Sequence, residues 1–249
     1  MMNMAFFRFY EELNDFLPSD KKKKLFSYSF TGNPSIKDAI EALGIPHVEV
    51  DMILVNSNSV GFGYRLQSHD YVSVYPVFES LDISNMTRLR DKPLRILKFI
   101  ADVHLGKLVK LIRLCGFDTY YRKDINDKDI ITLALSEARI ILTRDKGLLK
   151  NKQVTHGYWI RSQNPDEQLT EIINRFDLKD QMNLFTRCME CNGILSVVPK
   201  EDILDRLLPE TRKYFHDFKI CNDCKRIYWE GSHYDRMKRR LKWLSLDDG

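Results

Sequence analysis

Four cysteines in two short pairs are the residues whose spacing most specifically predicts chemistry in this chain. Cys188 and Cys191 are separated by two residues, and so are Cys221 and Cys224. Two Cys-x-x-Cys knuckles supply four thiolates, the number that closes a tetrahedral zinc site. A closed site of this kind is structural and performs no reaction. We therefore expect a zinc ribbon in this region and catalytic residues elsewhere in the chain.

The two cysteine pairs could instead form two disulfides, as pairs do in small secreted proteins. The chain is not small, at 249 residues, and only Cys115 lies outside the pairs. Residues 1–5 lack the basic start and apolar core of a secretory signal, and no apolar run is long enough to span a membrane. We therefore expect reduced thiols in a cytoplasmic protein that has no membrane partner.

Three aspartates are the candidate catalytic residues. Asp102 follows the apolar run 94–101, Asp145 follows the apolar run 139–143, and Asp127 begins the helix that leads into the second run. If both runs are parallel strands, their carboxyl ends meet at one edge of the sheet, and the three carboxylates converge there. Carboxylates are ligands of Mg²⁺ and Mn²⁺. Two such ions can activate a water and stabilise the leaving oxygen in phosphodiester hydrolysis.

Simpler roles are open for two of these aspartates. Asp127 could be only a helix N-cap, and Asp145 could be only a turn residue. Asp102 is harder to explain in this way, because an acid directly beside a buried strand is unfavourable unless it is paired or bound to a metal.

Basic residues near the aspartates could neutralise the charge of a phosphate. Arg144 directly precedes Asp145, and Lys107 and Arg113 lie on an amphipathic helix over residues 104–114, where we expect them to face outward. We predict these three as substrate-binding residues.

The second half of the chain alternates between strand and helix patterns. This order predicts a parallel sheet with helices on both faces. The predicted strands cover residues 94–101, 117–121, 139–143 and 157–161, and the predicted helices cover residues 104–114, 127–138 and 165–176.

The first half predicts a small domain of another kind. Strand patterns at residues 6–10 and 25–30 precede a helix that Ser35 should cap, and strand patterns at 48–56 and 71–77 follow. This order is that of a ubiquitin-like β-grasp domain. Residues 1–82 carry 7 Lys/Arg and 11 Asp/Glu, whereas residues 83–249 carry 32 and 24. A basic half fits a polyanionic partner such as RNA, although an uneven surface alone could produce this contrast.

The sequence resembles a known family in three blocks. The runs "FIADVHLGKLVKLIRLCGFDTYY" and "NDKDIITLALSEARIILTRDKGLL" are similar to the PIN-like RNase domain of the Mut-seven-C family. The segments "RCMECNG" and "CNDCKRIYWEGSHYDRM" resemble the zinc ribbon that ends this domain. The segment "IKDAIEALGIPHVEVDMILVN" resembles the ubiquitin-like domain often fused in front of it. This resemblance places the family's acidic residues at Asp102, Asp127 and Asp145.

One position departs from the wider PIN pattern. A glutamate usually lies on a helix between the first and third acids, but Glu137 comes too late in the chain to fill that position. Asp118 and Asp124 are the acids that could substitute for it.

The resulting prediction is an α+β β-grasp domain, an α/β PIN-like parallel-sheet domain and a C-terminal zinc ribbon. The expected boundaries are residues 1–82 for the β-grasp domain, 83–93 for a linker, 94–178 for the RNase domain, and 179–249 for the ribbon with its basic tail. The resemblance implies a metal-dependent ribonuclease with structural Zn and catalytic Mg or Mn. The alternative is a non-catalytic RNA- or ribosome-binding adaptor with a degenerate site. The β-grasp domain is expected to bind a protein partner, and the sequence gives no indication of oligomeric state.

Overall fold

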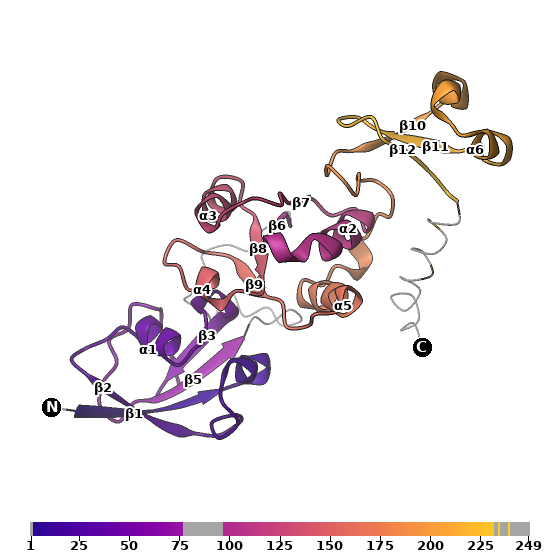
Figure 1. The fold of residues 1–249 in the computed structure, drawn as a ribbon. Helices are drawn as coiled ribbons and strands as arrows, with labels where there is room; N and C mark the ends of the chain where they lie inside the picture. The colour runs from indigo at the N-terminus through magenta and orange to yellow at the C-terminus, as the bar shows by residue number, and fades with distance from the viewer. Residues whose placement is uncertain (1, 77–96, 232–233, 235–238, 240–249) are drawn as a thin grey trace. The chain divides into compact units, whose positions relative to one another are not determined.

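The computed structural model describes residues 2–76, 97–231, 234 and 239, and the chain divides into two compact units (Figure 1). The first unit comprises residues 1–105 and 121–162, and the second comprises residues 106–120 and 163–249. The expected linker at residues 83–93, the start of the strand expected at 94–101 and much of the basic tail lie outside the described residues.

The predicted β-grasp domain forms the start of the first unit. Its five-stranded sheet has the order β2-β1-β5-β3-β4, in which β1 and β5 are parallel and the other neighbours are antiparallel. The strands are β1 (Met2–Phe9), β2 (Phe26–Thr31), β3 (Val50–Val55), β4 (Asn58–Ser59) and β5 (Tyr71–Pro76). Two short 3₁₀ helices are η1 (Glu11–Phe16) and η2 (His47–Glu49).

One helix covers the inner face of this sheet. Helix α1 (Ile36–Ala42) begins after Ser35, whose hydroxyl accepts a hydrogen bond from the Asp38 amide at 3.1 Å, as the sequence predicted. Side chains from α1 pack in one core with the inward residues of β1, β3 and β5; the core includes Phe7, Phe9, Ile36, Ile40, Ile53, Val72 and Val74.

A parallel sheet completes the first unit, as the alternation of strands and helices predicted. Strands β6 (Phe99–Ala101), β8 (Ile140–Thr143) and β9 (Gly157–Trp159) pair in parallel, with β8 between the other two. Helix α3 (Asp127–Ser136) contacts β6 and β8, and α4 (Lys146–Leu149) contacts β8 and β9. The register pairs Ala101 with Leu142, so the residues after β6 and β8 leave the sheet at the same edge.

The second unit combines helices with a small antiparallel sheet. Helices α2 (Gly106–Leu114) and α5 (Pro165–Arg175) pack against each other. Strands β10 (Leu195–Val198), β11 (Phe218–Cys221) and β12 (Ile227–Trp229) form the ribbon sheet. The remaining elements are η3 (Val103–Leu105) of the first unit, and β7 (Thr119–Tyr120), η4 (Lys179–Gln181), η5 (Lys200–Arg206) and α6 (Pro209–Tyr214) of the second.

Two details predicted from the sequence are wrong. Asn126, not Asp127, caps α3, because the Asn126 side chain accepts the Asp129 amide at 2.9 Å. Arg113 does not face solvent from α2 but is only 3% exposed, because backbone carbonyls in the second unit surround its guanidinium. No helix in the described part of the chain has both the length and the apolar character needed to cross a membrane.

Candidate active site and metal centre

Asp102 is a buried carboxylate at the end of β6. Its backbone N–H donates to the Leu142 carbonyl at 3.0 Å, which continues the parallel pairing by one residue. Asp102 is only 7% exposed, and its Oδ2 atom accepts a hydrogen bond from the Thr143 hydroxyl at 2.8 Å. Thr143 is the one hydrogen-bond donor that the described residues give to this carboxylate. A buried carboxylate with an oxygen left for another ligand fits a cation site.

Thr143 connects Asp102 to Asp145. The Thr143 Oγ1 atom donates to Asp102 and accepts the Asp145 backbone N–H at 2.9 Å. Thr143 is completely buried, so both partners are held at fixed positions relative to the end of β8. The structure therefore places these two predicted acids at one sheet edge, joined through a single hydroxyl.

Asp145 itself is exposed and begins helix α4. Its Oδ1 accepts the Gly147 backbone N–H at 2.7 Å, which is the N-cap geometry. This hydrogen bond agrees with the role of a turn residue, which the sequence left open for Asp145. It occupies one carboxylate oxygen and is compatible with a further ligand at the other.

Asp127 is the first residue of α3 and is exposed. No hydrogen bond or ion pair joins it to Asp102 or Asp145 among the described residues. Helix α3 nevertheless packs against β6 and β8, the two strands that carry the other acids. Its place in the site therefore remains a proposal.

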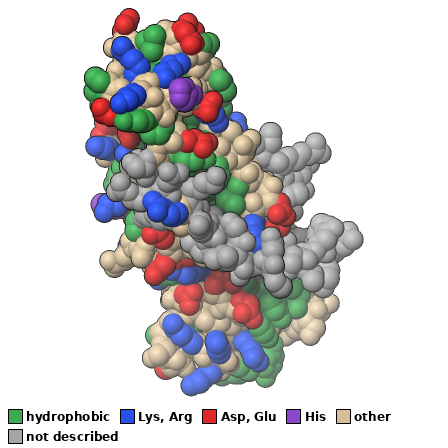
Figure 2. All heavy atoms as spheres, turned by 90° about the vertical axis from the view of Figure 1, so that its right-hand side faces the viewer, with side chains coloured by type: hydrophobic (Ala, Val, Ile, Leu, Met, Phe, Trp, Pro, Cys, Tyr) green, Lys and Arg blue, Asp and Glu red, His purple; other side chains and the backbone are tan. Residues whose placement is uncertain are grey.

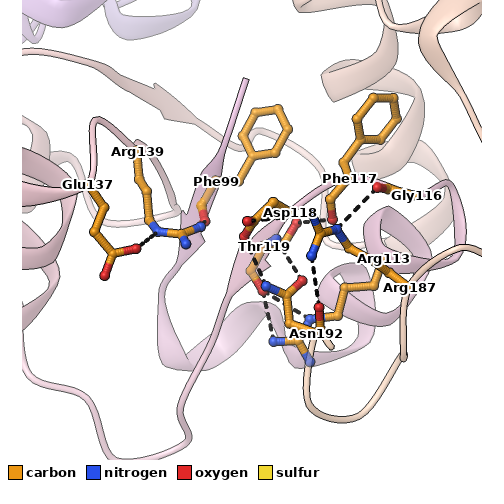
Figure 3. Close-up of polar contacts among 10 residues, drawn as sticks. All are labelled: Phe99, Arg113, Gly116, Phe117, Asp118, Thr119, Glu137, Arg139, Arg187 and Asn192. Carbon is orange, nitrogen blue, oxygen red and sulfur yellow. Dashed lines mark hydrogen bonds and ion pairs between the residues drawn. The ribbon is translucent and has the colours of Figure 1, made fainter. Parts of the chain in front are cut away.

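The acids that could replace the missing glutamate have other partners. Asp118 accepts the Asn192 side-chain amide at 2.9 Å and lies 3.6 Å from the Arg187 guanidinium within the second unit. Asp124 pairs with Arg122 at 2.8 Å. Glu137 pairs with Arg139 at 2.7 Å, and Arg139 also donates to a carbonyl of β6, as Figure 3 shows.

The predicted phosphate-binding residues fall into two groups. Arg144 and Lys107 are exposed, so both are available to a ligand. Arg113 is buried, and its guanidinium donates to the carbonyls of Thr119, Met189 and Glu190 at 2.8 to 3.1 Å. We therefore do not carry Arg113 forward as a substrate-binding residue.

The four paired cysteines come together as their spacing predicted, in a group that could hold a metal ion. Their sulfur atoms all lie within 4.8 Å of one another, and all are free thiols. The Cys188–Cys224 and Cys191–Cys221 sulfur distances are 3.6 and 3.4 Å, much longer than a disulfide of about 2.05 Å. Within the described residues, this is the one group of at least three His, Cys, Asp or Glu side chains close enough to hold a metal ion. Four sulfurs in this arrangement fit zinc.

The environment of the thiols differs from one to the next. Although burial raises the pKa of Cys188, hydrogen bonds from the Tyr228 hydroxyl and from backbone N–H groups lower it overall to about 7. Burial raises the pKa of Cys191 to about 12. Because only thiolates bind a metal, loading of the site must release protons. Gly193 is required beside it, since a Cβ there would lie 2.9 Å from Cys221 Sγ.

Helix α2 and the segment that follows it support the first knuckle. Arg113 reaches the carbonyls of Met189 and Glu190, while Asn192 accepts the Thr119 backbone N–H at 3.0 Å. Arg187 donates to the Asn192 carbonyl at 2.9 Å, and Figure 3 shows Arg113, Arg187 and Asn192 near Thr119. The knuckle and the α2–β7 segment are therefore one hydrogen-bonded body within the second unit.

The visible surface charge is mixed. On the face drawn in Figure 2, Lys and Arg side chains are interspersed with Asp and Glu side chains rather than gathered into one patch. RNA binding by the basic half of the chain therefore stays a prediction.

Comparison with known families agrees with the order of the parts. A family model described as Mut7-C RNAse domain matches residues 97–241, more than half of the chain. The chain belongs to the Mut7-C RNAse domain family. A second model, described as Mut7-C ubiquitin, matches residues 2–82, so the Mut7-C domain here follows a ubiquitin-like domain, as predicted. No curated protein and no solved structure matches the chain.

The sequence reasoning missed two residues of the Mut7-C domain that the structure brings to the candidate site. Thr143 lies in the Thr-Arg-Asp run, from which Arg144 and Asp145 were selected but not Thr143, and its strand-end position was the available indication. Trp159, at the end of β9, donates its indole N–H to the Arg144 carbonyl at 3.2 Å. Nothing in the local sequence pattern indicated that contact.

Proposed function

We propose that this protein is a metal-dependent ribonuclease that hydrolyses RNA phosphodiester bonds. The observation that carries the proposal is the buried Asp102 carboxylate, linked through Thr143 to Asp145 at the carboxyl ends of two parallel strands. The membership of the chain in an RNase domain family gives the reaction class. A cytoplasmic location is part of the same proposal.

Asp102 and Asp145 would hold Mg²⁺ or Mn²⁺, and Asp127 would be a third ligand only after moving closer, because the three carboxylates do not form a group compact enough for one ion among the described residues. When bound, such ions neutralise phosphate charge and lower the pKa of water. The hydroxyl of Thr143 orients Asp102 by donating to Oδ2, which leaves the other oxygen for a cation. Arg144 and Lys107 are exposed and would bind phosphates of the RNA.

We also propose that the four paired cysteines hold one structural Zn²⁺. The close sulfur atoms and their fixed backbone support this assignment. Such an ion would stabilise the fold of the second unit, because binding and folding are coupled in sites of this kind.

The test is cleavage of single-stranded RNA by the full-length protein in Mn²⁺, in Mg²⁺ and in EDTA. We expect cleavage with either metal and none in EDTA. Asp102→Asn and Asp145→Asn should each remove cleavage, because the amide keeps the shape of the side chain but loses the charge that a cation requires. Asp129→Asn is the matched control, since Asp129 contacts Asn126 and Arg122 rather than the other two acids. Melting curves establish that the variants fold.

Two outcomes contradict the proposal. Equal cleavage by wild type and Asp102→Asn would place the activity elsewhere or in a contaminant. RNA binding that persists in EDTA, without turnover in any metal, would support the alternative of a non-catalytic RNA- or ribosome-binding adaptor.

A further inference from the structure

Trp159 lies between the β-grasp domain and the turn that carries Asp145. All three belong to the first compact unit. Trp159 ends β9, the strand next to β8, and its partly buried ring packs against the apolar core of the β-grasp domain. Contacts on the two sides of this residue connect the two domains.

The β-grasp domain contacts both the backbone and the ring of Trp159. Glu49, which is completely buried, accepts the Trp159 backbone N–H at 2.6 Å. The Phe16 ring lies 4.7 Å from the Trp159 ring, at a tilt of 44°. A second link nearby is the hydrogen bond from His47 Nε2 to the Val154 carbonyl at 2.8 Å. A buried polar contact of this kind is costly to break, because it leaves an unsatisfied group inside the protein.

On its other side, Trp159 contacts both neighbours of Asp145. Its indole N–H donates to the Arg144 carbonyl at 3.2 Å. The Lys146 ammonium lies 4.0 Å from the Trp159 ring centroid and 4.8 Å from that of Phe16, in cation–π geometry. Burial and the nearby cations of Lys150 and Arg161 lower the pKa of Lys146. Trp159 therefore contacts the backbone of Arg144 directly before Asp145 and the side chain of Lys146 directly after it.

Asp145 passes this restraint to the buried acid. Its backbone N–H donates to Thr143, whose hydroxyl donates to Asp102. A shift of the turn at residues 144–146 would move the Thr143 acceptor contact and the Asp145 carboxylate together. Cation affinity depends on such positioning, because carboxylates must be held near their ligand geometry.

We propose that the ubiquitin-like β-grasp domain positions the acidic site in cis, using Phe16 and Glu49 to fix Trp159 and hence the turn at residues 144–146. The partner of this face of the domain is thus the RNase domain of the same chain. The catalytic part of the inference rests on the proposed nuclease function, whereas the positioning itself does not.

The first test measures amide hydrogen exchange in the full-length protein. Trp159→Phe keeps an aromatic ring but removes the donor to Arg144, and Phe16→Leu keeps apolar volume but removes the ring. In both variants the amides of Asp145 and Gly147 should exchange about tenfold faster, because local opening becomes easier. Phe16→Tyr, which keeps an aromatic ring, should exchange these amides at the wild-type rate. The control is Phe6→Leu, which removes a ring stacked on Tyr71, 4.9 Å away, in the same β-grasp domain.

The second test measures RNA cleavage against Mn²⁺ concentration. Trp159→Phe and Phe16→Leu should raise the Mn²⁺ concentration for half-maximal cleavage by about tenfold, since a less ordered carboxylate binds the cation more weakly. Phe6→Leu should match wild type in its Mn²⁺ dependence. A merely structural defect would lower the melting temperature without this selective change in metal dependence.

The outcomes separate the two proposals. Unchanged exchange at Asp145 and Gly147 in both variants would overturn the positioning role, whatever the activity. Faster exchange in a protein whose wild type cleaves no RNA would support the positioning role and contradict the nuclease. Equal changes in Phe6→Leu would show a general loosening of the domain and would also overturn the inference.

Discussion

Removal of the Arg113 guanidinium should loosen the first cysteine knuckle. Arg113 is only 3% exposed and makes four hydrogen bonds to three carbonyls, those of Thr119, Met189 and Glu190. Arg113→Met keeps much of the apolar stem and leaves all three carbonyls without this donor. The contacts to Thr119 are buried, but those to Met189 and Glu190 are only partly buried, so the loss should be about 1 to 3 kcal/mol, the cost of one buried carbonyl without a partner.

The position of Arg113 beside the thiols adds a second effect. Burial lowers the pKa of Arg113, and the negative charges of Cys188 and Cys191 oppose that change. A cation at this point therefore offsets the charge of a four-thiolate site. Arg113→Lys keeps the charge, but one compact ammonium cannot reach three carbonyls in the fork geometry of a guanidinium. Its effect should fall between wild type and Arg113→Met.

The assay is zinc transfer from the full-length protein to a chromogenic chelator. A loss of about 1 to 3 kcal/mol in the stability of the knuckle corresponds to roughly fivefold to a hundredfold faster release, at 1.4 kcal/mol for each factor of ten. Lys110→Met is the control. Its ion pair with Glu190, at 2.6 Å, is half exposed and contributes about 0.2 to 1 kcal/mol. Release from Arg113→Met at the wild-type rate would refute the reasoning.

Two further predictions concern the thiols. Purified protein should contain about one zinc per chain by elemental analysis. Cys188→Ser should lose that zinc and loosen the second unit, measured by amide exchange, while the β-grasp domain stays folded. Full zinc content in Cys188→Ser would contradict the site. Burial raises the pKa of Cys115 to about 12, so almost none of it is thiolate at pH 8, and maleimide should not label it in the native protein. Rapid labelling of Cys115, mapped by mass spectrometry, would show that the structure around the end of α2 opens readily.

Local patterns in the sequence determined many of the helices and strands and the cluster of four cysteines. The Ser35 cap, the β-grasp order and the parallel strands depend on hydrophobic periodicity and capping chemistry within short windows. Two residues between paired cysteines let a single knuckle bring both sulfur atoms to one point. This local spacing therefore predicted the close sulfur atoms. Asp102 was selected because an acid follows a buried strand directly, and its burial is confirmed.

Contacts between distant segments were decided only by the tertiary structure. Helical periodicity predicted that Arg113 faces outward from α2, but the knuckle more than 70 residues later buries it. Thr143 links the two acids because β6 and β8 pair in register. The residues close to Thr143 in the sequence carry no information about that pairing. Trp159 contacts Glu49 across 110 residues of chain. These outcomes depend on which surfaces meet on folding, and that choice reflects burial and hydrogen bonding summed over the whole unit.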